Sequence, residues 1–172
     1  AVSAAETLTE ITLGIIPTES SSGAMKGFEP FRADMERALG LPVKLFIAPH
    51  YAGVIEAMRF NKVHIAWFGN KSAIEAVNRA SGEVLVQTVD VTGNPGYWSL
   101  IVVHKDSPYQ NIDEIIRDGK NLTFGNGDPN STSGYLIPTY YVWGQRGIDP
   151  TKHFKLVRSA NHETNLMAVA NK

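Results

Sequence analysis

The 172-residue sequence contains no cysteine, which excludes disulfide bonds, thiolate metal sites and cysteine nucleophiles within it. It also lacks a run of about 18 apolar residues, the length that a membrane-spanning helix needs. The formal net charge is −1, so there is no basic field to attract nucleic acid or an anionic membrane surface. We therefore expect neither a nucleic-acid partner nor direct membrane insertion.

Common cofactor and metal motifs are missing as well. No Lys follows the glycines as a nucleotide P-loop requires, and the G-x-G-x-x-G pattern that begins at Gly125 and Gly127 fails because position 130 is Asn. A carboxylate-rich calcium loop is absent. No H-x-x-x-H or H-E-x-x-H spacing occurs, so we expect no metal and no cofactor. The histidines are His50, His64, His104, His153 and His162.

What is present is an alternation of strand and helix patterns. The apolar content of 43% and charged content of 19% exclude a disordered chain. The alternation predicts an α/β fold with a mostly parallel sheet covered by helices, and then a second, smaller α/β unit. The three tryptophans are expected in the core, and Pro138 is expected to kink its helix. Strands are predicted over 11–16, 43–47, 63–68, 84–91, 97–103, 122–124 and 154–158. Helices are predicted over 28–39 with a cap at Gly40, around 54–58, from a cap at Asn70, around 112–116, and over 132–145 and 163–171.

The most informative segment holds three consecutive hydroxyl residues, Ser131, Thr132 and Ser133, between a predicted strand and a predicted helix. Ser and Thr are good N-cap residues, and the first N–H groups of a helix lack partners within it. These donors and the helix dipole favour an anion at this position. The segment therefore predicts either a simple helix cap or a cradle for a tetrahedral oxyanion.

Several segments resemble the phosphonate-binding proteins of ABC importers, and the resemblance extends from about residue 11 to residue 172. It implies a two-lobed periplasmic binding protein of type II-like fold that closes on its ligand around a hinge. Such a protein has no catalytic activity and delivers phosphonates to an ABC permease in the inner membrane. The lobes would be residues 1–98 and 99–172. The matching segments are 49–55, 58–63, 95–99, 125–134 and 161–165.

The resemblance also assigns ligand contacts. The phosphonate group would be held by the hydroxyl cluster Ser131, Thr132 and Ser133 together with Tyr51 and His162. Tyr97 would flank the organic substituent, and its aromatic face suits the cationic amine of an aminoalkylphosphonate.

The resemblance further implies that the chain is part of a longer protein. Both lobes would lack a returning segment, and the acidic residues that hold the ligand's amino group would lie beyond Lys172. The small residues 1–6 resemble the region around a signal-peptidase site.

Two other functions compete with this one. Helix-terminal donors accept phosphite, phosphate or a sulfonate as readily as a phosphonate. A hydrolase would use Ser131 or Ser133 with His162 and Asp128, but the G-x-S-x-G elbow is missing.

Overall fold

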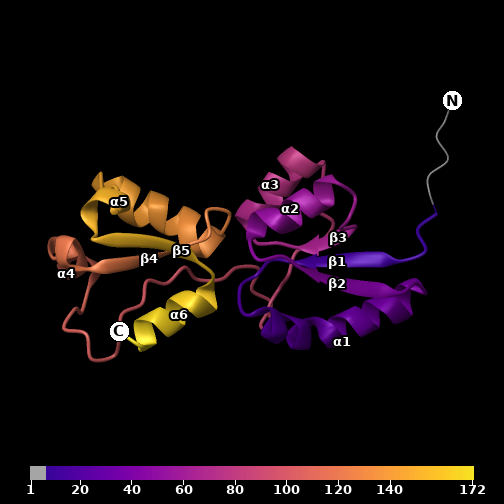
Figure 1. Cartoon of the computed structure of the whole chain (residues 1–172), viewed down its shortest axis with the longest axis horizontal. Coiled ribbons are helices and arrows are strands. Elements are labelled where there is room, and N and C mark those ends of the chain that lie inside the picture. Colours follow the sequence, from indigo (N-terminus) through magenta and orange to yellow (C-terminus); the bar gives the residue numbers. More distant parts are fainter. Residues whose placement is uncertain (1–6) are drawn as a thin grey trace.

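The computed structural model describes residues 7–172, and the residues expected near a signal-peptidase site, 1–6, lie outside this range. Two α/β units lie side by side along the longest dimension of the molecule (Figure 1). We refer to residues 7–80 as the N-terminal unit, to 81–111 as the connecting segment and to 112–172 as the C-terminal unit.

The N-terminal unit contains a three-stranded parallel sheet in the order β2-β1-β3. Its strands are β1 (Ile11–Ile15), β2 (Val43–Ile47) and β3 (Ile65–Trp67), and its helices are α1 (Ser21–Leu39), α2 (Tyr51–Arg59) and α3 (Asn70–Ala80). Helix α1 ends at Gly40 as the sequence predicts, but it begins at Ser21, seven residues before the predicted start. Ser20 accepts a hydrogen bond from the backbone of Gly23 (3.3 Å), and the helix ends at Gly40 with φ of +66°.

Helices cover both faces of strand β1. Leu13 and Ile15 point to the face where Phe28 and Met35 of α1 pack. Gly14 faces the other side, where an added Cβ would meet the side chains of Val54 and Val63 at 2.8 Å. The central strand thus fixes α1 and α2 on opposite faces of the sheet.

The C-terminal unit contains a two-stranded parallel sheet of β4 (Thr123–Gly127) and β5 (Leu156–Ala160). Phe124, Trp143 and Phe154 form its aromatic core, with ring centroids 5.2–5.3 Å apart. Its helical elements are α4 (Ile112–Arg117), η1 (Gly119–Asn121), η2 (Thr132–Leu136), η3 (Pro138–Trp143), η4 (Gly144–Arg146), α5 (Pro150–His153) and α6 (His162–Ala170). The predicted α/β fold with parallel sheets is confirmed in both units.

The helix predicted over 132–145 forms with wide, π-type turns. The N–H of Leu136 donates to the carbonyl of Ser131, five residues earlier (3.0 Å). Ile137, the residue between η2 and η3, is also helical (φ −63°, ψ −52°), and its N–H donates to the carbonyl of Thr132. The helix therefore continues through Pro138, which begins η3 and has no N–H to donate. The kink expected at Pro138 stays a prediction.

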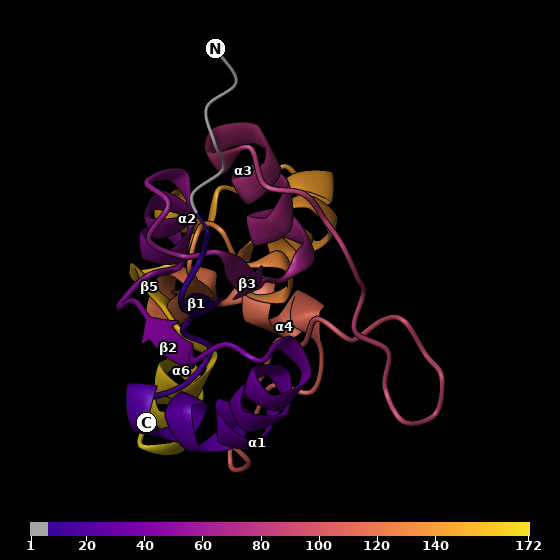
Figure 2. The same cartoon turned by 90° about the vertical axis from the view of Figure 1, so that its right-hand side faces the viewer.

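The strands predicted over 84–91 and 97–103 are wrong. Both stretches belong to the connecting segment, which loops out from the N-terminal unit (Figure 2) and then runs along the C-terminal unit (Figure 1). A strand requires a hydrogen-bonded neighbour, and within residues 7–172 neither stretch has one. Between them the chain turns, with Gly93 at φ of +87°.

The three tryptophans also differ in whether the predicted burial is observed. Trp143 is buried as predicted, but Trp67 is 36% exposed and Trp98, in the connecting segment, is 87% exposed. Their expected burial is therefore wrong, because an apolar side chain is buried only where another element packs over it.

Candidate functional site

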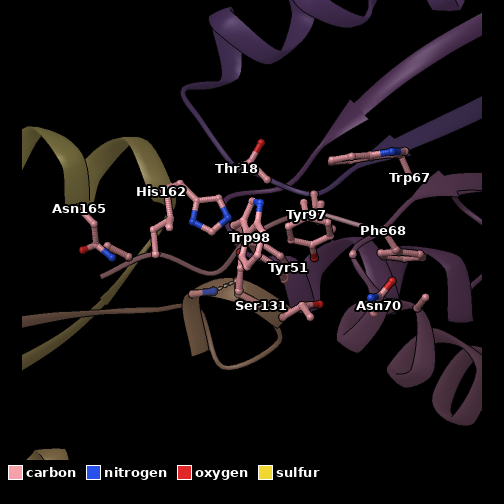
Figure 3. Close-up of a pocket in the computed structure, with 18 of the residues that line it drawn as sticks. Thr18, Tyr51, Trp67, Phe68, Asn70, Tyr97, Trp98, Ser131, His162 and Asn165 are labelled. Carbon is pink, nitrogen blue, oxygen red and sulfur yellow. Dashed lines mark hydrogen bonds between the residues drawn. The ribbon is translucent and has the colours of Figure 1, made fainter. Parts of the chain in front are cut away.

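Polar residues gather where the carboxyl ends of the two parallel sheets face each other. Thr18 follows β1, Tyr51 follows β2 and Gly69 follows β3, so all three lie at one edge of the first sheet. Ser131 follows β4 and His162 follows β5 at the corresponding edge of the second. Because the carboxyl ends of parallel strands share an edge, both edges open onto one cleft between the units (Figure 3).

All six residues that the sequence assigns to ligand contacts line this cleft. Tyr51 comes from the N-terminal unit, Tyr97 from the connecting segment, and Ser131, Thr132, Ser133 and His162 from the C-terminal unit. The cavity of ≈ 2380 Å³ is larger than a small-molecule pocket because it continues along the apolar connecting segment.

Ser131 is the N-cap of η2 and is only 3% exposed. Its Oγ accepts a hydrogen bond from the N–H of Gly134 (3.0 Å), drawn dashed in Figure 3. This bond does not use the hydroxyl proton of Ser131. The cap predicted from the sequence is thus formed, and it also lines the cleft.

Thr132 connects the two units. Its Oγ1 accepts a hydrogen bond from the N–H of Lys71 in the first turn of α3 (2.9 Å). Helix α3 has Gly69 as its N-cap, so the prediction that Asn70 caps it is wrong. The acceptor that Asn70 was expected to supply comes instead from Thr132, which lies 61 positions after Lys71 in the chain.

Ser133 and Tyr97 are held near this contact. The carbonyl of Ser133 accepts from the Ser99 hydroxyl (2.7 Å), which ties the connecting segment to the hydroxyl cluster. A Cβ at Gly69 would lie 3.2 Å from Thr132 Oγ1 and 3.5 Å from the Tyr97 hydroxyl. The glycine therefore permits the close approach of both groups.

Tyr51 is 3% exposed and packs with Ile16, Ala48 and Val54. Burial raises the pKa of its phenol, while a hydrogen bond with Ser131 acts in the opposite direction. The phenol is therefore a neutral donor at physiological pH. It faces the hydroxyl cluster from the opposite unit.

His162 begins α6 and lies beside the turn of η2, since a Cβ at Gly134 would be 3.3 Å from its Cε1. Burial lowers the pKa of this imidazole below its ordinary value of about 6.5. In the ligand-free cleft the ring is therefore neutral at pH 7. An anion beside it favours the protonated form.

The lowered pKa of His162 predicts a pH-dependent stability. When the pH falls below about 6.5, the unfolded state binds a proton that the folded state resists, so the free energy of unfolding falls until the pH reaches the folded pKa. His162→Gln is expected to remove this contribution. Denaturant unfolding from about pH 5 to about pH 8 measures it; parallel profiles for the variant and the parent protein would contradict it.

Gly127, the last residue of β4, lets the strand pass directly over η2. An added Cβ would lie 2.6 Å from the backbone of Gly134. Gly127→Ala is therefore expected to lower the free energy of unfolding by roughly 1–3 kcal/mol and to displace the hydroxyl cluster.

Gly27 in α1 is the matched control, since a Cβ there meets no atom within 4 Å. Gly27→Ala is expected to raise stability by about 0.5–1 kcal/mol. Denaturant unfolding of both variants checks this contrast, and equal effects would refute the close approach.

Three features of the cleft are missed by the sequence patterns. The carbonyl of Thr18 accepts from the N–H of Glu163 (3.3 Å), and the Glu163 carboxylate accepts from the N–H of Ser20. The side chain of Asn165 donates to the carbonyl of Asn126 (2.9 Å), which joins α6 to β4. These contacts join residues 39–145 positions apart or lie on backbone atoms, so no local motif signals them.

Two negative findings apply to residues 7–172. No group of three or more His, Asp or Glu side chains is placed to hold a metal ion. No helix in this range is long and apolar enough to cross a membrane.

Comparison with known proteins identifies the family. Residues 13–172 match the family described as "ABC transporter, phosphonate, periplasmic substrate-binding protein". The phosphonates-binding periplasmic protein of Escherichia coli K12 is 54% identical over 162 residues, which cover 94% of this chain and 48% of the relative. The phosphate-import protein PhnD of Mycolicibacterium smegmatis is 33% identical over 94% of this chain and 52% of the relative.

A solved structure agrees. The binding-protein component of an ABC phosphonate transporter from Pseudomonas aeruginosa has a TM-score of 0.92 and 54% identity, covering 94% of this chain and 54% of that one. The chain thus spans about half the length of these relatives. The chain belongs to the phosphonate family of periplasmic ABC-transporter substrate-binding proteins, which are binding proteins and not enzymes.

Proposed function

We propose that this chain is part of a solute-binding protein that captures phosphonates between its two α/β units and delivers them to an ABC permease. One observation carries the proposal. A buried N-cap serine and its neighbouring hydroxyls face Tyr51 across a cleft between the units. This arrangement offers several hydroxyl and backbone donors to a tetrahedral anion.

Each cleft residue has a role in this proposal. Ser131, Thr132 and Ser133 donate hydroxyl and backbone hydrogen bonds to the phosphonate oxygens from the start of η2. Tyr51 donates its phenol O–H from the N-terminal unit, so the ligand bridges the units. His162 takes up a proton when the anion binds and then donates a charge-assisted hydrogen bond.

The organic substituent is assigned to Tyr97. Its ring is exposed in the cleft beside Gly69, where an alkyl or aminoalkyl group can pack on its face. A preference for an aminoalkylphosphonate also needs an acidic partner for the amine. We place that partner beyond Lys172.

We further propose that residues 1–98 and 99–172 contribute to two lobes of a type II-like binding protein that closes around a hinge. The strand order β2-β1-β3 and the position of the cleft at the carboxyl edges of both sheets support this division.

The function is tested by calorimetric titration of the intact protein with 2-aminoethylphosphonate, with inorganic phosphate as competitor. We expect tight phosphonate binding that phosphate does not displace. The proposal would be overturned if 2-aminoethylphosphonate gave no binding heat and also displaced no other bound anion from the protein.

Inorganic phosphate or another oxyanion such as phosphite or a sulfonate is the second candidate. Helix-terminal N–H groups and hydroxyls bind any tetrahedral oxyanion, and the 33% identical relative is named a phosphate-import protein. If phosphate binds more tightly than every phosphonate in the same titration, this candidate replaces the first.

A hydrolase is not supported. Within the described residues, no hydrogen bond joins His162 to a serine hydroxyl, and Ser131 Oγ is engaged with the backbone of Gly134. A nucleophilic serine needs such a base within hydrogen-bonding distance.

A further inference from the structure

Three helix N-termini at the contact between the units are capped across that contact. The N–H of Ser20, which caps α1, donates to the carboxylate of Glu163 in the other unit. In return, the N–H of Glu163 in α6 donates to the carbonyl of Thr18 (3.3 Å). In α3 the acceptor for Lys71 is Thr132 Oγ1 (2.9 Å).

Glu163 makes two of these contacts, one with Ser20 and one with Thr18, and they lie at a different place from the contact of Thr132 with Lys71. Thr132 lines the cleft, whereas Glu163 does not. Its carboxylate lies instead at the N-terminus of α1, where the helix dipole favours negative charge. Glu163 therefore follows the proposed ligand residue His162 directly but turns its charge away from the anion site.

This placement solves an electrostatic problem. A free carboxylate beside His162 would repel a phosphonate dianion and oppose its binding. The α1 N-terminus stabilises that charge only while the two units are in contact. When the units separate, the hydrogen bond between the Glu163 carboxylate and the N–H of Ser20 breaks, and water must solvate both groups.

We infer that Glu163 is a positioning residue that holds the two units together in the closed arrangement, without contacting the ligand. The expected effect on ligand affinity rests on the proposed function, whereas the effect on the arrangement of the two units does not. Loss of the Glu163 carboxylate shifts the units toward a more open arrangement and weakens ligand binding through that shift.

The closure is tested first without ligand. Lys26→Cys in α1 and Lys120→Cys in η1 provide two exposed positions for spin labels, since residues 1–172 contain no cysteine; any cysteine elsewhere in the intact protein is replaced first. Glu163→Ala is expected to move the distance distribution between the labels to longer distances than in the parent protein. Glu163→Gln, which keeps an acceptor but no charge, is expected to give a smaller shift.

Glu114→Ala is the matched control. Glu114 lies in the first turn of α4 and accepts from the N–H of Gln110 (2.7 Å), at the end of the connecting segment, so it caps the start of its own helix and joins no helix of the N-terminal unit. Its loss is expected to lower stability but to leave the label distance unchanged. The inference is overturned if Glu163→Ala leaves the distance unchanged, or if Glu114→Ala shifts it equally.

The affinity is tested second, by titration of the same variants with 2-aminoethylphosphonate. Glu163→Ala is expected to weaken binding by roughly two- to fivefold, mainly through faster dissociation, and saturating ligand is expected to restore the short label distance. An unchanged affinity despite a longer distance would overturn the link to ligand binding. Failure of the parent protein to bind would refute the proposed function, while the ligand-free distances would still decide the closure.

Discussion

The double variant Ser131→Ala/Thr132→Ala is expected to lose at least about 100-fold in phosphonate affinity. In the proposed site each hydroxyl donates to a charged phosphonate oxygen, and hydrogen bonds to charged groups contribute about 1.5–3 kcal/mol each. Removing two of them thus costs about 3 kcal/mol or more, since 1.4 kcal/mol corresponds to a factor of ten in the dissociation constant. Calorimetric titration with 2-aminoethylphosphonate measures the loss.

Two properties of these residues require a control. Ser131 is also the N-cap of η2, and its loss lowers stability by about 1 kcal/mol. Thr132 also joins the units through Lys71. The matched control is Thr151→Ala, which removes an exposed hydroxyl that donates to Asp149 in the same unit (2.6 Å). If the double variant is folded and binds like the control, the hydroxyl cluster is not the anion site.

Tyr51→Phe is expected to weaken phosphonate binding by roughly 10- to 100-fold with little loss of stability. The ring stays and keeps its packing against Ile16 and Val54. Only the phenol O–H is lost, and with it the donor that we propose the N-terminal unit offers to the ligand. Burial makes the loss larger, because water cannot readily replace the missing donor in a site that is 3% exposed.

Tyr140→Phe is the control for Tyr51→Phe. Tyr140 is 61% exposed on η3 and does not line the cleft, so its hydroxyl is expected to be dispensable for binding. Isothermal titration and denaturant unfolding of both variants separate the two effects. Normal affinity in Tyr51→Phe would exclude the proposed bridging of the units by the ligand.

Local patterns predicted the elements that have local causes. Helix α1 ends at Gly40 because a left-handed residue terminates it, and Ser131 caps η2 because its hydroxyl reaches the N–H three residues later. The convergence of the six cleft residues also followed from the sequence. Each follows a predicted strand or was assigned by the family resemblance, and parallel strands bring such residues to one edge.

The errors have a common physical cause. The runs 84–91 and 97–103 have strand-like composition, but composition measures a tendency to be buried and not the presence of a hydrogen-bonded neighbour. Trp98 is exposed for the same reason. The cap that Thr132 supplies to α3 depends on a residue 61 positions away, so no window of the sequence contains both partners.

The central position of β1 bears on the order in which the two sheets can form. β2 and β3 add to the two sides of β1, each after a single intervening helix, so the first sheet is built from one unbroken stretch of the chain, residues 11–67. Compact units of this kind tend to fold one by one. The proposed anion site contains residues from both units up to His162, so the folding chain would acquire affinity for its ligand only after the second sheet has formed as well.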